Sequence, residues 1–150
     1  MKVLIDNNVI IDFLNQREPF FEDSYKIFQL GMEGVIETIM SAGDITTIYY
    51  VIRKSLQNPI IAREKIFLLS NIIKICKSTP EDITSAIILF IPDFEDAVIA
   101  AIARREKADY IITRNEKDFV NSPIPAVNPA EFLALAQMEN IGENFTKDFL

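Results

Sequence analysis

The stretch that decides the fold, residues 92–119, reads PDFEDAVIAAIARREKADYIITRNEKDF. Its first half starts with Asp93 and Asp96 and continues into the apolar run 97–103, a pattern that predicts a buried helix with acids at its start. Its second half holds the short apolar run 110–112, which predicts a buried strand. In an open parallel sheet, strand ends and the starts of the following helices lie at one edge. We therefore expect the acids and the polar residues after the strand to share a crevice.

Polar residues also follow the first apolar run of the chain. Residues 2–5 read as a strand, and Asp6, Asn7 and Asn8 come directly after it. By the same rule, this cluster lies at the edge where residues 113–118 lie. The N-terminus therefore supplies a third part of the predicted crevice.

Working outward, short apolar runs alternate with amphipathic stretches along the whole chain. Further strands are predicted at residues 35–40, 71–77 and 126–127, and helices at 9–14, 24–32, 45–54, 60–70, from 80 onward and 129–138. This alternation predicts one α/β domain, residues 1–138, with a mainly parallel sheet. Residues 139–150 are predicted to be a weakly ordered tail or a partner-binding arm.

Composition excludes several kinds of chemistry. The chain has no histidine, which rules out Ser-His and Cys-His catalysis and zinc sites built on imidazole. It has no glycine-rich loop of the nucleotide-binding kinds. With 22 acidic and 15 basic residues, the net charge of −7 argues against a broad basic surface that grips nucleic acid unaided. Bound divalent cations reverse that sign locally, so a nucleic-acid substrate remains open.

The single cysteine, Cys76, sits beside an apolar run, so we expect a buried packing role and no internal disulfide. No apolar run is long enough to span a bilayer, and the N-terminus lacks the regions of a signal peptide. We therefore expect a cytoplasmic protein without a membrane partner.

Carboxylates carry the predicted chemistry. Mg²⁺ and Mn²⁺ prefer oxygen ligands, often one or two carboxylates with waters, and such ions activate water against a phosphodiester. The candidate acids are Asp6, Asp93, Asp96 and Asp118, with Asn8, Thr113 and Asn115 as polar companions.

Each acid also has a plainer interpretation. Asp93 fits the N-cap of a helix, and Asp96 is favoured in a first turn by the helix dipole. Asp6 fits the start of a turn, and Asp118 fits a solvated loop. Asp12 is expected to be an exposed helix residue. Arg114 is the best basic candidate for a phosphate contact.

Three segments together resemble a known family. MKVLIDNNVIIDFL (1–14) is similar to the opening of a PIN domain, and PDFEDAVIAA (92–101) and DYIITRNEKDF (109–119) resemble the third and fourth motifs of that family, in the same order. The resemblance covers residues 1–135. It implies a three-layer α/β/α fold, a Mg²⁺- or Mn²⁺-dependent ribonuclease activity, and similarity to VapC-type toxins, which are homodimers inhibited by a small antitoxin.

Carried over by position, the resemblance places the first family acid at Asp6, its nearby Asn at Asn8, and the third acid at Asp96, with Asp93 as an additional carboxylate. We predict that Asp6, Asp96 and Asp118 are metal ligands and that Asp93 and Asn115 assist catalysis. The predicted substrate contacts are Asn8, Thr113 and Arg114. The chain departs from the family pattern at Thr47, where the family usually has Glu, and at Asn115, where it usually has a fourth acid; Asp44 is the nearest acid to Thr47.

Three hypotheses follow. The first is a metal-dependent endoribonuclease that hydrolyses RNA by metal-activated water. The second, supported by Thr47 and Asn115, is a PIN-fold module with weakened or lost catalysis that binds RNA or a protein. The third is a receiver-like phosphotransfer domain, against which the lack of a second acid beside Asp6 counts.

Overall fold

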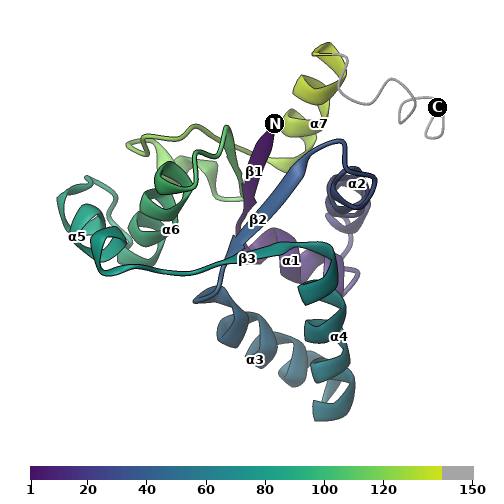
Figure 1. The fold of residues 1–150 in the computed structure, drawn as a ribbon. Coiled ribbons are helices and arrows are strands. Elements are labelled where there is room, and N and C mark those ends of the chain that lie inside the picture. Colours follow the sequence, from purple (N-terminus) through teal and green to yellow (C-terminus); the bar gives the residue numbers. More distant parts are fainter. Residues whose placement is uncertain (140–150) are drawn as a thin grey trace.

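Strands and helices alternate along the chain in the computed structural model, which describes residues 1–139 (Figure 1). The strands are β1 (Lys2–Ile5), β2 (Glu37–Ser41), β3 (Lys74–Cys76), β4 (Tyr110–Ile112) and β5 (Ala126–Val127). The helices are α1 (Asn7–Leu14), α2 (Phe21–Met32), α3 (Asp44–Leu56), α4 (Pro59–Ile72), α5 (Pro80–Ile88), α6 (Phe94–Arg105), the 3₁₀ helix η1 (Glu116–Phe119) and α7 (Pro129–Met138). The tail predicted at 139–150 lies, apart from residue 139, outside the described residues.

The five strands form one parallel sheet in the order β3-β2-β1-β4-β5, with β1 at its centre. Side chains of β1 alternate between two apolar cores: Val3 and Ile5 face one, and Leu4 faces the other. The first core is completed by α1, α2, α3, α4 and α7, and the second by α5, α6 and η1. The fold is therefore the expected three-layer α/β/α arrangement (Figure 1).

Two strands begin later than predicted. β2 begins at Glu37 rather than at residue 35, and β3 begins at Lys74 rather than at residue 71, because α4 continues to Ile72. Ile72 packs against the first core as part of the helix. A β-branched run is apolar enough for either element, so the pattern alone places this boundary wrongly.

Side-chain caps fix the helix starts near the carboxyl edge. The Asp93 carboxylate accepts the backbone N–H of Asp96 (3.1 Å), as the cap interpretation predicted. Thr79 and Asp82 form a reciprocal capping box at α5, and Arg105 of α6 donates to Asp82 (2.9 Å). This ion pair ties the first turn of α5 to the last residue of α6.

Two parts project from the sheet in Figure 1: the pair α5 and α6 on one side, and the pair α3 and α4 below. We call the second pair the arm. The carboxyl ends of β1 and β2 point into the space between these two parts. Within residues 1–139, no helix is both long and apolar enough to cross a membrane.

Candidate metal centre at the carboxyl edge of the sheet

Asp6 is the first residue after β1 and the N-cap of α1. Its carboxylate accepts the backbone N–H of Asn7 (2.9 Å), and Oδ2 accepts the hydroxyl of Thr113 (2.8 Å). The side chain is only 5 % exposed. Burial raises the pKa of Asp6, and the two hydrogen bonds oppose that rise. The cap geometry therefore points a nearly buried acid toward the edge of the sheet.

Asn8, on α1, forms hydrogen bonds with the loop that follows β4. Its amide nitrogen donates to the Thr113 hydroxyl (3.3 Å), and its amide oxygen accepts the backbone N–H of Arg114 (3.2 Å). The backbone N–H of Asn115 also donates to the Thr113 hydroxyl (3.1 Å), while the Asn115 side chain is exposed. Asn8 and Thr113 thus hold Asp6 in one orientation. Their predicted substrate contacts are untested.

Asp44, the first residue of α3, contributes a second buried acid. It is 2 % exposed, and its Oδ2 has no hydrogen-bond partner among the described residues. The amide of Asn7 lies between Oδ1 of Asp44 and Oε1 of Glu95, at 3.4 Å from each. Burial, with repulsion by Asp6 and Glu95, raises the pKa of Asp44 to about 7. A buried carboxylate oxygen without a donor needs a cation or a proton.

The start of α6 brings further acids to the same place. Burial raises the pKa of Asp96 to about 7, and repulsion by Asp6, Asp93 and Asp118 adds to the rise. Asp118, exposed on η1, also repels Asp6. Repulsion of this kind weakens with distance, so Asp6, Asp93 and Asp118 lie near Asp96. The structure therefore brings all four predicted acids to one edge.

The donor set suits a hard divalent cation. It consists of carboxylate, amide and hydroxyl oxygens, and the orphaned Oδ2 of Asp44 is a buried acceptor that a cation would satisfy. Across residues 1–139, no three acidic or cysteine side chains already stand as the ligands of one ion. Mg²⁺ is commonly held by one or two carboxylates with waters, so two acids of this cluster suffice.

Asp12 and Arg114 differ from expectation. Asp12 was expected to be exposed, which is wrong: it is 1 % exposed and accepts from Nε of Arg114 (2.6 Å). The Arg114 guanidinium also lies 4.1 Å from the ring centroid of Phe20. This face of α1 is covered by the loop after β4, so an acid there needs a partner. The phosphate contact of Arg114 stays a prediction, and the ion pair with Asp12 competes with it.

Two residues were missing from the predicted site. Asp44 was noted only as the acid nearest to Thr47, and Glu95 was not singled out; Thr47 itself is exposed. The signal for Asp44 was available, because it starts the helix after β2, and the edge rule applies to β2 as it does to β1 and β4. Glu95 carried no comparable signal, since an acid in a first turn is common.

Comparison with known proteins agrees with the fold described above. Residues 2–117 match the family model described as PIN domain. The chain is 26 % identical over 136 residues to ribonuclease VapC1 of Aquifex aeolicus, covering 87 % of this chain and 92 % of that protein.

Two solved structures show the same fold. VapBC2 from Rickettsia felis, bound to a promoter DNA fragment, has a TM-score of 0.69 at 19 % identity, covering 85 % of this chain and 98 % of the other. VapC20 of Mycobacterium tuberculosis, a sarcin-ricin-loop-cleaving toxin, has a TM-score of 0.60 at 10 % identity, covering 73 % and 86 %. With the family model matched over most of the described residues, the chain belongs to the PIN domain family.

Proposed function

We propose that this protein is a divalent-metal-dependent endoribonuclease of the VapC type, which hydrolyses RNA phosphodiesters. One observation carries the proposal: Asp6, Asp44 and Asp96 come from three separate segments, and repulsion by Asp6 raises the pKa of both Asp44 and Asp96. The amide of Asn7, 3.4 Å from both Asp44 and Glu95, joins the same three segments. Such an arrangement is costly without a cation and fits a nuclease centre. The similarity to ribonuclease VapC1 and to VapC20 supports RNA as the substrate.

In this proposal Asp6 and Asp96 would hold Mg²⁺ or Mn²⁺, and Asp44 and Asp118 would add negative charge around it. When bound, such an ion would lower the pKa of a water molecule and offset charge on the phosphate. Thr113 keeps Asp6 oriented through its 2.8 Å hydrogen bond. Asp93, at the rim, caps α6 and so fixes the direction of Asp96.

The partners follow from the relatives. Structures of similar proteins include a toxin-antitoxin complex from Klebsiella pneumoniae, with a TM-score of 0.64. We propose that this chain acts in the cytoplasm, forms homodimers and binds a small antitoxin. Two exposed apolar surfaces are available to such partners. One holds Ile87 and Ile88 at the end of α5 and Phe90 just after it, and the other holds Ile60 and Phe67 of α4.

The alternative is a PIN-fold module without catalysis, which binds RNA or a protein. It is favoured by Thr47, an exposed residue where the family usually has Glu, and by Asn115. It predicts an acidic edge without measurable affinity for Mg²⁺ or Mn²⁺, which isothermal titration of the purified protein decides.

The deciding experiment is cleavage of a mixed RNA panel with Mg²⁺ or Mn²⁺, by the wild type and by Asp6→Asn and Asp96→Asn. Glu33→Gln, an exposed acid on the far side of α2, is the matched control. We expect cleavage by the wild type and the control only. Cleavage that survives in both site variants indicates a contaminating nuclease, and absence of cleavage by the wild type favours the binding module.

A further inference from the structure

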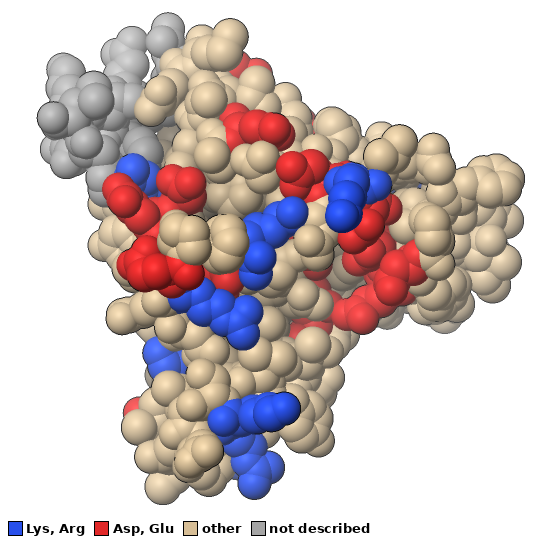
Figure 2. Space-filling model, turned by 180° about the vertical axis from the view of Figure 1, so that it is seen from behind, with Lys and Arg blue, Asp and Glu red and all other residues tan. Residues whose placement is uncertain are grey.

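Positive charge on this acidic protein is concentrated on the arm. Residues 44–72 carry four basic residues and two acidic residues, of which Asp44 is buried at the metal centre, whereas the whole chain has a net charge of −7. Figure 2 shows basic side chains gathered at the free end of the arm, apart from the acidic side chains nearer the middle of the molecule. The free end of the arm is therefore positively charged, although the protein as a whole is negatively charged.

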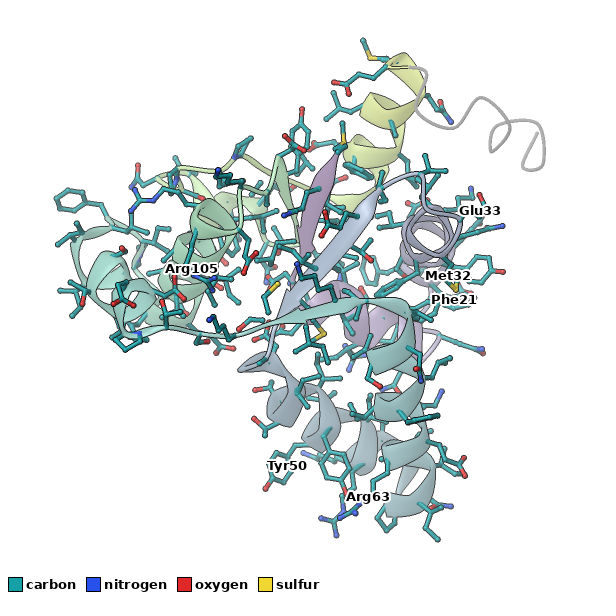
Figure 3. All side chains as sticks on the ribbon, in the orientation of Figure 1. Phe21, Met32, Glu33, Tyr50, Arg63 and Arg105 are labelled. Carbon is teal, nitrogen blue, oxygen red and sulfur yellow. The ribbon has the colours of Figure 1, made fainter. Side chains whose placement is uncertain are left out.

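One exposed face of α3 carries this charge together with an aromatic ring. Thr47, Tyr50 and Lys54 recur at helical spacing, and Arg53 lies beside them. All four are exposed, and Tyr50 is 66 % exposed. We call these four residues the α3 stripe. Figure 3 shows that Arg63, from the start of α4, lies near Tyr50 at the same end of the arm.

The cations of the arm are not engaged by acids. Within residues 1–139, Arg53, Lys54 and Arg63 take part in no ion pair, whereas Arg105 and Arg114 are held by Asp82 and Asp12. Three unpaired cations around an exposed ring form the usual surface for single-stranded nucleic acid, in which bases stack on aromatic side chains and cations follow the backbone.

The stripe lies on the helix that begins at the candidate metal centre, because Asp44 is the first residue of α3. Asp44 and Arg53 are nine residues apart, about 14 Å along the helix axis. A strand bound with one phosphate at the metal centre would meet the stripe a few nucleotides away. Attraction along the stripe would also offset the repulsion of phosphates by the acids of the centre.

We propose that the α3 stripe and Arg63 bind the single-stranded RNA that leads into the metal centre, with Tyr50 stacking on a base and Arg53, Lys54 and Arg63 contacting phosphates. This proposal rests on the proposed ribonuclease function. It adds the path of the RNA beyond the phosphodiester that is cleaved.

The test measures RNA binding separately from cleavage. Fluorescence anisotropy of a labelled single-stranded RNA is recorded with Mg²⁺ in an Asp96→Asn background, which keeps the RNA uncut. The stripe variants are Tyr50→Ala, Tyr50→Phe and the double variant Arg53→Gln/Lys54→Gln. The charge-matched control is Arg104→Gln/Lys107→Gln, two exposed cations at and beyond the end of α6, on the opposite side of the sheet.

We expect Tyr50→Ala to weaken binding by about tenfold and Tyr50→Phe to leave it unchanged, because the ring alone stacks. The double variant Arg53→Gln/Lys54→Gln loses two phosphate contacts. The plot of the logarithm of the RNA association constant against the logarithm of salt concentration should therefore become less steep by about 1.4, since each contact to a single strand contributes roughly 0.7. The control should change neither quantity. Thermal unfolding of each variant, matched to the parent, shows that the fold is intact.

Two results would overturn the inference. If the wild type cleaves RNA while the stripe variants, in the Asp96→Asn background, bind RNA like the control, the RNA lies elsewhere and the proposed function stands. If RNA binding is unchanged but the variants lose a co-purified protein partner, the stripe is a protein interface. Absence of both binding and cleavage by the wild type would overturn the inference together with the proposed function.

Discussion

The ion pair between Asp12 and Arg114 offers a quantitative test of how the metal centre is held in place. Asp12 is 1 % exposed and Arg114 is 27 % exposed, with 2.6 Å between Nε and Oδ2. Removing one partner from a wholly buried pair costs roughly 3 to 5 kcal/mol. Solvent at Arg114 screens the charge, so we expect Arg114→Met to lower the free energy of unfolding by about 2 to 3 kcal/mol.

The structure supplies a matched control on the same carboxylate. Arg17 lies 3.9 Å from Oδ1 of Asp12, but its side chain is 43 % exposed. Arg17→Met should therefore cost at most about 1 kcal/mol. Urea unfolding at pH 7 measures both variants, and Asp12→Asn completes a double-mutant cycle with Arg114→Met. In thermal melts, the expected loss for Arg114→Met corresponds to roughly 4 to 12 °C.

The pH dependence adds a second readout. Burial raises the pKa of Asp12, and Arg114 and Arg17 oppose that rise. Without Arg114 the pKa of Asp12 rises further above its unfolded value, so the stability lost in Arg114→Met should grow as the pH rises through the folded pKa of Asp12. Equal losses in the Arg114 and Arg17 variants, or a coupling near zero in the cycle, would refute this account of the pair.

Three further predictions concern the acids and their support. Asp44→Asn should raise the melting temperature of the metal-free protein at pH 8, because it removes a buried charge, and should weaken protection by Mg²⁺; differential scanning fluorimetry with and without Mg²⁺ measures both. In the wild type, Asp44 and Asp96 have pKa values of about 7 against 3.8 when unfolded, so metal-free stability should fall as pH rises from about 4 to 7. Urea midpoints at pH 5 and 8 test the sign, which a higher midpoint at pH 8 would contradict. Thr113→Val removes the hydroxyl that donates to Asp6. We expect it to lower the free energy of unfolding in urea by roughly 1.5 to 3 kcal/mol and to slow RNA cleavage. Thr84→Val, at an exposed position of α5, is the control and should change neither quantity.

Much of the fold follows from local sequence patterns. The central strand β1 and the apolar helix α6 are predicted by periodicity, and the starts of α5 and α7 by a proline after a capping residue. The boundary between α4 and β3 is not predicted, because isoleucines suit both elements and packing on the core decides between them.

The sequence predicts the site residues that directly follow a strand, but it does not predict contacts between residues that are far apart in the chain. Asp6 and Thr113 are predicted from their places after β1 and β4. The burial of Asp12 depends on Arg114, 102 residues later, so no local pattern contains it. Asp44 could have been predicted, because it follows β2 at the same edge of the sheet. It was missed because the family pattern places its acid at the position of Thr47.

The strand order has a consequence for the time at which the acids meet. β1 is made first, but its neighbour β4 pairs with it only after more than a hundred further residues, and Thr113 follows β4. During synthesis from the N-terminus, a chain that ends before β4 holds Asp6 without its donor and with one side of β1 unpaired. Pairing at this distance is slow compared with local contacts. The acidic edge is therefore among the last features of the molecule to form, and a shortened chain cannot assemble it.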